Sequence, residues 1–461
     1  MQSRFVHADD DDLEEGEEEQ VTADGAKGGD GKGGGLLKSI SSCFDSYMGI
    51  YVALEDKALD EGMAKILSAE TWQVNPSGRA DTRVFNSSKE LFLALKRQYK
   101  RSTALNMSGV THELLHKVWS KHLRGYAKRV LEQLPPVTQP ADPSQPPTCS
   151  IDEPAQRVVC AVVNTSEYCS DTTEGLAETV GKTIDEEFRD KVDLGAVQDA
   201  FNGVVDSGMK VLVAALEARV GPHVKAMVGI KWDAMEEIGD DTSQYMQDIV
   251  TQTRQMMPQL GEHLSGKYVT FFCTKFVSNF VPRLIGNIYR CKRIGEVGAQ
   301  QMQVDVGTLK QTLLDLPMLG QASATTSYNR LVAHELGKAE QVLKLIQTPE
   351  ELLETTVEEM RSTCAGRLTA APHLSSFSSP QLPSKSTLAR MLCAHVSVAW
   401  PSPHSLWLPC RSGVEPDLQK ILELKGLKKA GTEKLLEAYN NKLLEAREGG
   451  EKIFTKMLGR G

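Results

Sequence analysis

The chain has 461 residues, 25% of them charged and 6% aromatic, which is enough for two or three soluble domains with a sizeable core. The formal net charge is −9, and residues 1–35 account for most of it, because they hold eleven acidic and only three basic side chains. The remaining chain is close to neutral and lacks the overall basic excess typical of nucleic-acid-binding proteins, so no nucleic-acid partner is expected. It has no run of 18 uncharged apolar residues, so any membrane contact is expected to be peripheral.

The N-terminal part is predicted to be a disordered tail followed by a helical bundle. Residues 1–35 are acidic and then Gly-rich, and they carry too little apolar surface to fold. Residues 36–134 show apolar side chains at helical spacing and are predicted to form a bundle. The first helix of this bundle carries its apolar residues at Leu37, Ile40, Phe44, Met48, Tyr51, Leu54 and Leu59.

Two further helices are predicted before the chain reaches a linker. The first should be capped by Asn86 or Ser87, since short polar side chains accept hydrogen bonds from free helical N–H groups. Its apolar face comprises Leu91, Leu95 and Tyr99. The next helix should span residues 111–134. Residues 135–151 are Pro-rich and are predicted to be a linker, because proline interrupts helices.

Residues 152–364 are predicted to form a second helical bundle. One helix should break near Pro222, and another should kink or divide at Pro282, because proline lacks a backbone donor and clashes with the preceding turn. Pro317 and Pro349 are expected to end two further helices. The helix around Pro282 has a single apolar stripe, made of Val269, Phe272, Phe276, Phe280, Leu284 and Ile288.

The C-terminal part changes composition twice. Residues 365–416 are rich in Ser and Pro and are predicted to be a disordered insertion. Residues 417–461 are helical in pattern again and are expected to complete the second bundle. The sequence shows no strong alternation of period two, so the predicted fold class is all-α, with consecutive antiparallel helices packed into bundles.

The nine cysteines are scattered along the chain and form no C-x-x-C pair. This pattern argues against a cysteine zinc site, and the odd count argues against a disulfide framework. Reduced thiols in a cytosolic protein are the simplest interpretation. Four cysteines in helical segments are expected to be core thiols, namely Cys160, Cys169, Cys273 and Cys291.

His112, Glu113 and His116 match the H-E-x-x-H pattern of zinc metallopeptidases, and His122 follows ten residues after the first histidine. In that pattern two histidines one helical turn apart bind the metal, and the glutamate is the general base for the metal-bound water. These four residues are therefore candidates for a zinc site.

The longer form of the pattern needs glycine where this sequence has Trp119, because the chain must turn back there. If the helix continues instead, His122 lies about 15 Å along the axis from His112. One zinc ion cannot bind all three histidines, since zinc–nitrogen bonds are about 2 Å long. We therefore interpret the histidines as exposed or half-exposed side chains of an amphipathic helix, with no catalytic residue, metal or cofactor. A zinc metallopeptidase is the alternative that metal content would decide.

Two small basic clusters are candidates for contact with partners or membranes. Cations near a helix end are often simply solvated there, where they also suit the helix dipole. The alternative is a docking point for acidic partners or anionic headgroups. The clusters comprise Arg290, Lys292 and Arg293, and Lys425, Lys428 and Lys429.

Several segments together resemble the family of vacuolar protein sorting-associated protein 53, a subunit of the GARP and EARP tethering complexes. They include ISSCFDSYMGIYVALEDKALDE, NTSEYCSDTTEGLAETV, the long block from Tyr268 to Pro317, and LQKILELKGLKK. The similarity runs in order from about residue 36 to residue 363 and resumes at residue 417.

The resemblance implies a rod of stacked helical bundles, as in other subunits of multisubunit tethering complexes, without enzymatic activity. It implies a role in retrograde transport from endosomes to the trans-Golgi network and in endocytic recycling, on the cytosolic face of those membranes. The expected partners are vacuolar protein sorting proteins 51, 52 and 54, or syndetin, with SNAREs and small GTPases as further candidates. A generic helical scaffold unrelated to trafficking is the remaining alternative.

Two departures from the family pattern stand out. The N-terminal coiled-coil region through which these subunits assemble has no counterpart, so the chain is expected to be a truncated gene model or a C-terminal fragment of the family, and its ability to join the complex is left open. Residues 365–416 have no counterpart either. Their abrupt change of composition suggests translated intron, which transcript reads across the segment would test.

Overall fold

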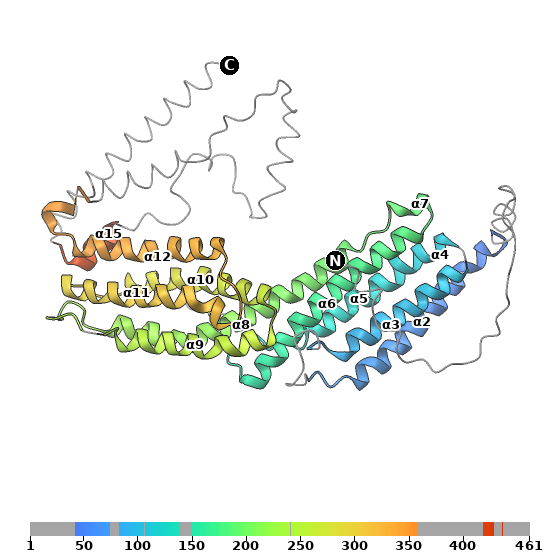
Figure 1. Cartoon of the computed structure of the whole chain (residues 1–461), viewed down its shortest axis with the longest axis horizontal. Coiled ribbons are helices and arrows are strands. Elements are labelled where there is room, and N and C mark those ends of the chain that lie inside the picture. The colour runs from blue at the N-terminus through green and yellow to red at the C-terminus, as the bar shows by residue number, and fades with distance from the viewer. Residues whose placement is uncertain are drawn as a thin grey trace, which may run out of the picture. The chain divides into compact units, whose positions relative to one another are not determined.

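The computed structural model describes residues 42–73, 83–105, 107–138, 140, 147, 149–239, 241–353, 355–356, 418–427 and 436. All regular elements within this part of the chain are helices (Figure 1), which confirms the predicted all-α class. None of these described helices combines the length and the hydropathy needed to cross a bilayer. The predicted tail, residues 1–35, and the predicted insertion, residues 365–416, lie outside the described residues.

The chain divides into two compact units, and the division passes through four long helices. Unit 1 comprises residues 1–221, 251–276 and 315–325, and unit 2 comprises residues 222–250, 277–314 and 326–461. Helices α8, α9, α10 and α11 each contribute to both units; they span Gly195–Gly229, Gln244–His263, Gly266–Ile288 and Glu296–Leu319. The predicted separation of bundles 36–134 and 152–364 at the Pro-rich linker 135–151 stays a prediction.

The first part of unit 1 is a set of helices that lie side by side (Figure 1). Helices α2 and α3 are antiparallel, because the Ser87 N–H at the start of α3 donates to Glu70 Oε2 after α2 (2.7 Å), while Gln98 Nε2 further along α3 donates to the Glu55 carbonyl (2.8 Å). The elements are η1 (Ser42–Phe44), α2 (Asp45–Ala69), α3 (Asn86–Ala104), α4 (Ser108–Glu113), η3 (Leu114–Trp119), α5 (Ser120–Leu131), α6 (Glu153–Thr183) and α7 (Glu186–Arg189).

Helix α3 shows how the apolar pattern selects its buried face. Leu91 and Leu95 are fully buried, as their helical spacing predicts. The predicted cap is wrong, because the helix already begins at Asn86, and Phe85 precedes it without a capping side chain. The Ser88 hydroxyl donates back to the Phe85 carbonyl (2.7 Å) and fixes this turn in another way.

The predicted break near Pro222 and the predicted division at Pro282 are both wrong, whereas a kink at Pro282 stays a prediction. Helix α8 continues through Pro222, and α10 continues undivided through Pro282. Both prolines are exposed, so each ring faces outward while buried neighbours such as Val224 and Leu284 hold the helix against the core. Packing of an apolar face therefore outweighs the loss of one backbone hydrogen bond.

Unit 2 contains the remaining helices, and the apolar stripe predicted for α10 belongs to unit 1 up to Phe276 and to unit 2 from Phe280 onward. Helix α11 ends at Leu319, two residues beyond Pro317, and α12 (Thr326–Gln347) ends just before Pro349. They are followed by η4 (Glu350–Leu352) and α15 (Leu418–Lys425). The predicted stripe is buried along its whole length at Val269, Phe272, Phe276, Phe280, Leu284 and Ile288.

The cysteines expected to be core thiols are indeed buried and free. Burial raises the pKa of Cys160 and of Cys273 to about 12, and the pKa of Cys291 to about 11. The pKa of Cys169 is also raised by burial. Thiols with such pKa values stay protonated and unreactive near neutral pH.

Candidate functional site

The helix that carries the metallopeptidase pattern continues through the position where a peptidase chain would turn back. Helix α4 leads without interruption into the π-helix η3 and then into α5. Trp119 is fully buried in this run, and its indole N–H donates to Gln98 Oε1 (2.9 Å). The prediction of a continuous helix is confirmed, while the π-helical turn inside it was not predicted.

The two histidines of the pattern are close together but are engaged by other parts of the protein. Their ring centroids lie 4.5 Å apart. The His116 Nε2–H donates to the Lys191 carbonyl (2.7 Å), and the His112 ring lies 5.1 Å from that of Phe188. Glu113, which would be the general base of a peptidase, forms an ion pair with Lys117 one turn further along. The arrangement therefore directs Glu113 toward a cation rather than toward a metal-bound water.

His112 lies in a partly apolar environment that disfavours its charged form. Its Nε2 atom is buried and has no hydrogen-bond partner among the described residues. Burial, followed by the nearby His116 and Lys191, lowers the pKa of His112 below its usual value. A neutral imidazole packed on Phe188 is the expected state at neutral pH.

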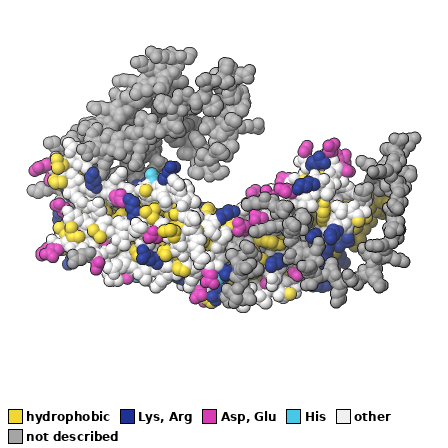
Figure 2. All heavy atoms as spheres, in the orientation of Figure 1, with side chains coloured by type: hydrophobic (Ala, Val, Ile, Leu, Met, Phe, Trp, Pro, Cys, Tyr) yellow, Lys and Arg dark blue, Asp and Glu magenta, His cyan; other side chains and the backbone are white. Residues whose placement is uncertain are grey.

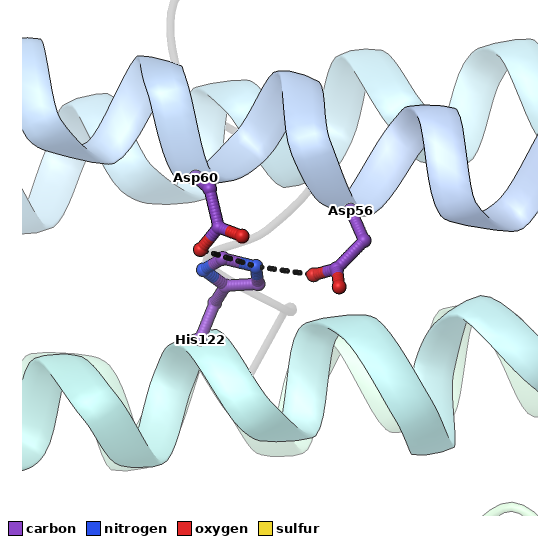
Figure 3. Close-up of side chains that lie close together, drawn as sticks. All are labelled: Asp56, Asp60 and His122. Carbon is purple, nitrogen blue, oxygen red and sulfur yellow. Dashed lines mark hydrogen bonds and ion pairs between the residues drawn. The ribbon is translucent and has the colours of Figure 1, made fainter.

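The third histidine contacts a different helix and is not exposed, contrary to the expectation from sequence. The His122 side chain is only 6% exposed, and its Nε2–H donates to Asp56 Oδ1 of α2 (2.8 Å), with Asp60 Oδ1 at 3.7 Å. Figure 3 shows the imidazole pointing from α5 between the two carboxylates. The burial is decided by the acidic side chains of α2, which lie far away in the sequence.

This cluster has the donor types of a metal site, and it is already neutralised by a lysine. Asp56, Asp60 and His122 place three ligand atoms within 4.8 Å of one another. Carboxylate and imidazole groups suit zinc, yet Lys121 Nζ lies 2.9 Å from Asp56 and 3.4 Å from Asp60. Burial tends to raise the pKa of Asp56, but hydrogen bonds from Lys121 and His122 outweigh it and lower that pKa. The cluster therefore joins α2 to α5 as an ion-pair network. The sequence signal for it was the spacing of Asp56 and Asp60, one helical turn apart.

In unit 2 the first basic cluster lies next to Lys425, the described member of the second cluster. The Ile294 N–H, next to Arg293, donates to the Leu424 carbonyl, next to Lys425 (3.0 Å). Arg293 also lies directly over Gly426, whose φ of +76° favours glycine. Arg290, Lys292 and Arg293 are exposed at this junction, whereas Lys428 and Lys429 lie outside the described residues.

Lys425 differs from the other members of these clusters. Its ammonium donates to the carbonyls of Ile346 (2.7 Å) and Thr348, at the end of α12. Burial lowers its pKa. This placement makes Lys425 a cap for the last carbonyls of α12, and its proposed contact with a partner or membrane stays a prediction.

Comparison with known proteins shows which family the chain belongs to. A family model described as exocyst complex component Sec6 matches residues 46–362, which is more than half of the chain. The chain belongs to the Sec6 family. The helices that carry the histidines and the stripe of α10 both lie within this matched Sec6 region.

Two relatives of this Sec6-family chain confirm the resemblance predicted from its sequence. Vacuolar protein sorting-associated protein 53 A from Arabidopsis thaliana is 31% identical over 414 residues, covering 89% of this chain and 44% of the relative. The vacuolar protein sorting-associated protein 53 homologue from Caenorhabditis elegans is 27% identical over 345 residues, covering 70% of this chain and 42% of the relative. The chain thus spans less than half of the length of these curated relatives.

A solved structure supports the fold of this Sec6-family chain. The crystal structure of the C-terminal domain of the exocyst subunit Sec6p has a TM-score of 0.55 and 12% sequence identity. It covers 93% of this chain and 95% of the Sec6p chain. The likeness confirms the predicted helical fold of a tethering-complex subunit.

Proposed function

We propose that this chain is a non-enzymatic subunit of a vesicle-tethering complex of the GARP or EARP type. The observation that carries the proposal is the match to vacuolar protein sorting-associated protein 53 from two organisms, over 89% and 70% of the chain. Helical bundles suit tethering, because long helices packed along apolar stripes give reach and stiffness. The engagement of Glu113 by Lys117 favours this function over the metallopeptidase alternative.

The finer expectations follow from the same resemblance. The chain would act at the cytosolic face of the trans-Golgi network and of endosomes, as a peripheral component. Its partners would be vacuolar protein sorting proteins 51 and 52, with 54 or syndetin as the fourth subunit. SNAREs and small GTPases would be contacted by the assembled complex.

Two surfaces support a role in contacting partners. In unit 2 the exposed side chains of Arg290, Lys292 and Arg293 form a basic corner that suits acidic surfaces or anionic headgroups. In unit 1 the end of η1 and the first turns of α2 carry an exposed apolar stripe, and such stripes commonly mark protein contacts. The stripe is made of Phe44, Tyr47, Ile50 and Leu54, which are 54%, 61%, 61% and 61% exposed.

Affinity purification of the full chain from its native cells tests the proposal. The expected result is co-purification of the other tethering subunits, and their absence at normal expression would refute it. The variant R290E/K292E/R293E should recover fewer partners while keeping its helical circular dichroism.

A control variant on α12 separates the basic corner from general charge effects. R330E/K344E changes two exposed cations of α12 and should leave partner recovery unchanged. Equal recovery with both variants would remove the basic corner from the contact surface and leave the apolar stripe of α2 as the remaining candidate.

A further inference from the structure

The outer face of α3 is strongly basic although the chain as a whole is acidic. Lys89, Lys96, Arg97 and Lys100 fall within an arc of about 100° of the helix, at 3.6 residues per turn. They extend about 16 Å along the axis. Lys96 is half-buried, and the other three side chains are exposed. In Figure 2, Lys and Arg side chains gather over α2 and α3 on the face drawn. We refer to these four residues as the basic face of α3.

The cations of the basic face have no anionic partner within the described part of the chain. Neighbouring cations do have such partners, since Arg101 binds both carboxylate oxygens of Glu55 and Lys121 binds Asp56. Among the residues of α3, Glu90 is the one acidic side chain. Like charges concentrated on one face of a helix repel each other and create a positive potential, so this face attracts an anionic ligand.

The same chain carries a strongly anionic segment. Residues 9–19 read DDDDLEEGEEE and contain nine acidic side chains. The nine acidic side chains outnumber the four cations of the basic face, so the segment has enough negative charge to pair with all four. Charge complementarity therefore points to this segment as an occupant of the face.

The connection between the two is long enough for them to meet. Residues 20–41 include seven glycines, and Gly-rich sequences of 22 residues have a root-mean-square span of about 26 Å. Glu55 of α2 contacts Arg101, next to Lys100, and lies about 20 Å along the helix from residue 42. The near end of the basic face is thus within the ordinary reach of the linker.

We propose that residues 9–19 dock on the basic face of α3 within the same molecule. Because the segment and the face belong to one chain, the effective concentration is in the millimolar range, so weak individual ion pairs suffice. The docked segment would cover the face and keep other anionic surfaces away from it. The interaction would weaken with salt, because both partners are exposed charges.

Carbodiimide cross-linking of the full chain tests the proposal, because it joins a carboxylate to an amine only where the two are in contact. Trypsin releases residues 5–27 as one peptide that contains all nine acidic side chains of the segment. We expect this peptide to be joined to Lys96 and Lys100 about tenfold more than to Lys57, at about 0.01 M salt. Lys57 is a matched control, since it is exposed on α2 and lies about 200° round the helix from Glu55, which contacts α3.

Arg97 allows a variant that keeps the reacting amines in place. R97E should reduce the cross-links at Lys96 and Lys100 several-fold, whereas R330E, with the same change of net charge, should not. Raising the salt to about 1 M, where the Debye length is about 3 Å, should abolish them. Equal cross-linking of Lys57, or a yield that rises with protein concentration, would overturn the proposal.

Vesicles of phosphatidylserine distinguish the segment from a membrane surface. Replacing the nine acidic residues by Asn and Gln should free the basic face and increase sedimentation of the chain with these vesicles. If the unaltered chain already binds them equally well and shows no cross-links, the face belongs to a membrane and the intramolecular docking is wrong.

Discussion

The contact between His122 and Asp56 gives a stringent test of how α2 is held in unit 1. The substitutions are H122A, D56A and the double variant, which form a double-mutant cycle. His122 is almost completely buried and donates to Asp56 at 2.8 Å, whereas the Asp56 side chain is 32% exposed. The cycle isolates the interaction between these two side chains, because Lys121 stays present in all four proteins.

The expected coupling free energy is about 1 to 2 kcal/mol. A hydrogen bond to a charged group contributes about 1.5–3 kcal/mol, and the partial exposure of Asp56 brings the value toward the lower end. A second cycle on Lys121 and Asp60 should show less than about 0.5 kcal/mol, since both side chains are about half exposed and lie 3.4 Å apart.

Urea unfolding followed by circular dichroism measures the global effect, and hydrogen exchange of α2 and α5 peptides assigns it to this contact. H122A should speed exchange in α2 more than in α12. A coupling below about 0.3 kcal/mol, with both single variants destabilised, would refute the reasoning. It would mean that His122 is held by apolar packing alone and that Asp56 serves only Lys121.

Three further predictions follow from individual side chains. G261A should destabilise the protein by about 1–3 kcal/mol in urea unfolding, because a Cβ at this position would overlap the backbone after α11. G125A, where a Cβ would meet open space, should stabilise the protein by about 1 kcal/mol. A stabilised G261A variant would contradict this reasoning. H112L should stabilise by about 1 kcal/mol at pH 7, because a buried unpaired nitrogen is removed. The gain in the free energy of unfolding of H112L over the unaltered chain should grow as the pH falls below 6.5. There His112 binds a proton in the unfolded chain but resists protonation in the folded chain, because its pKa is lowered. A gain that shrinks toward low pH would contradict this direction. K425M should leave the carbonyls at the end of α12 without this donor and lower the free energy of unfolding by about 1–2 kcal/mol. It should also speed hydrogen exchange in residues 418–427. Unchanged exchange there would rule out the capping role.

Much of the helical structure was predictable because it depends on local periodicity. The buried positions Leu91 and Leu95 of α3, and the stripe of α10, follow directly from apolar spacing. The continuation of the helix past Trp119 was predictable from the apolar side chains on either side of it. Where local rules met long-range packing, they gave the wrong answer, as the uninterrupted helices at Pro222 and Pro282 show.

The candidate sites were less predictable, because they depend on which helices become neighbours. The burial of His122 needs Asp56 of α2, and the capping role of Lys425 needs the end of α12. Arg293 and Lys425 become neighbours in the fold, where the Ile294 N–H donates to the Leu424 carbonyl. No spacing within either segment could have indicated these contacts.

The sequence by itself determined the all-α class, the buried faces of α3 and α10 and the resemblance to the family of vacuolar protein sorting-associated protein 53, because helical periodicity and family similarity are properties of the linear chain. The predicted apolar face of the first helix was wrong at Phe44 and Leu54, which are exposed. Only the tertiary structure decided what the three histidines do. Imidazole, carboxylate and ammonium groups are short-range partners, and their protonation and hydrogen bonds depend on neighbours that folding brings from distant parts of the chain. His112 packs on Phe188, His116 donates to Lys191, and His122 joins α5 to α2.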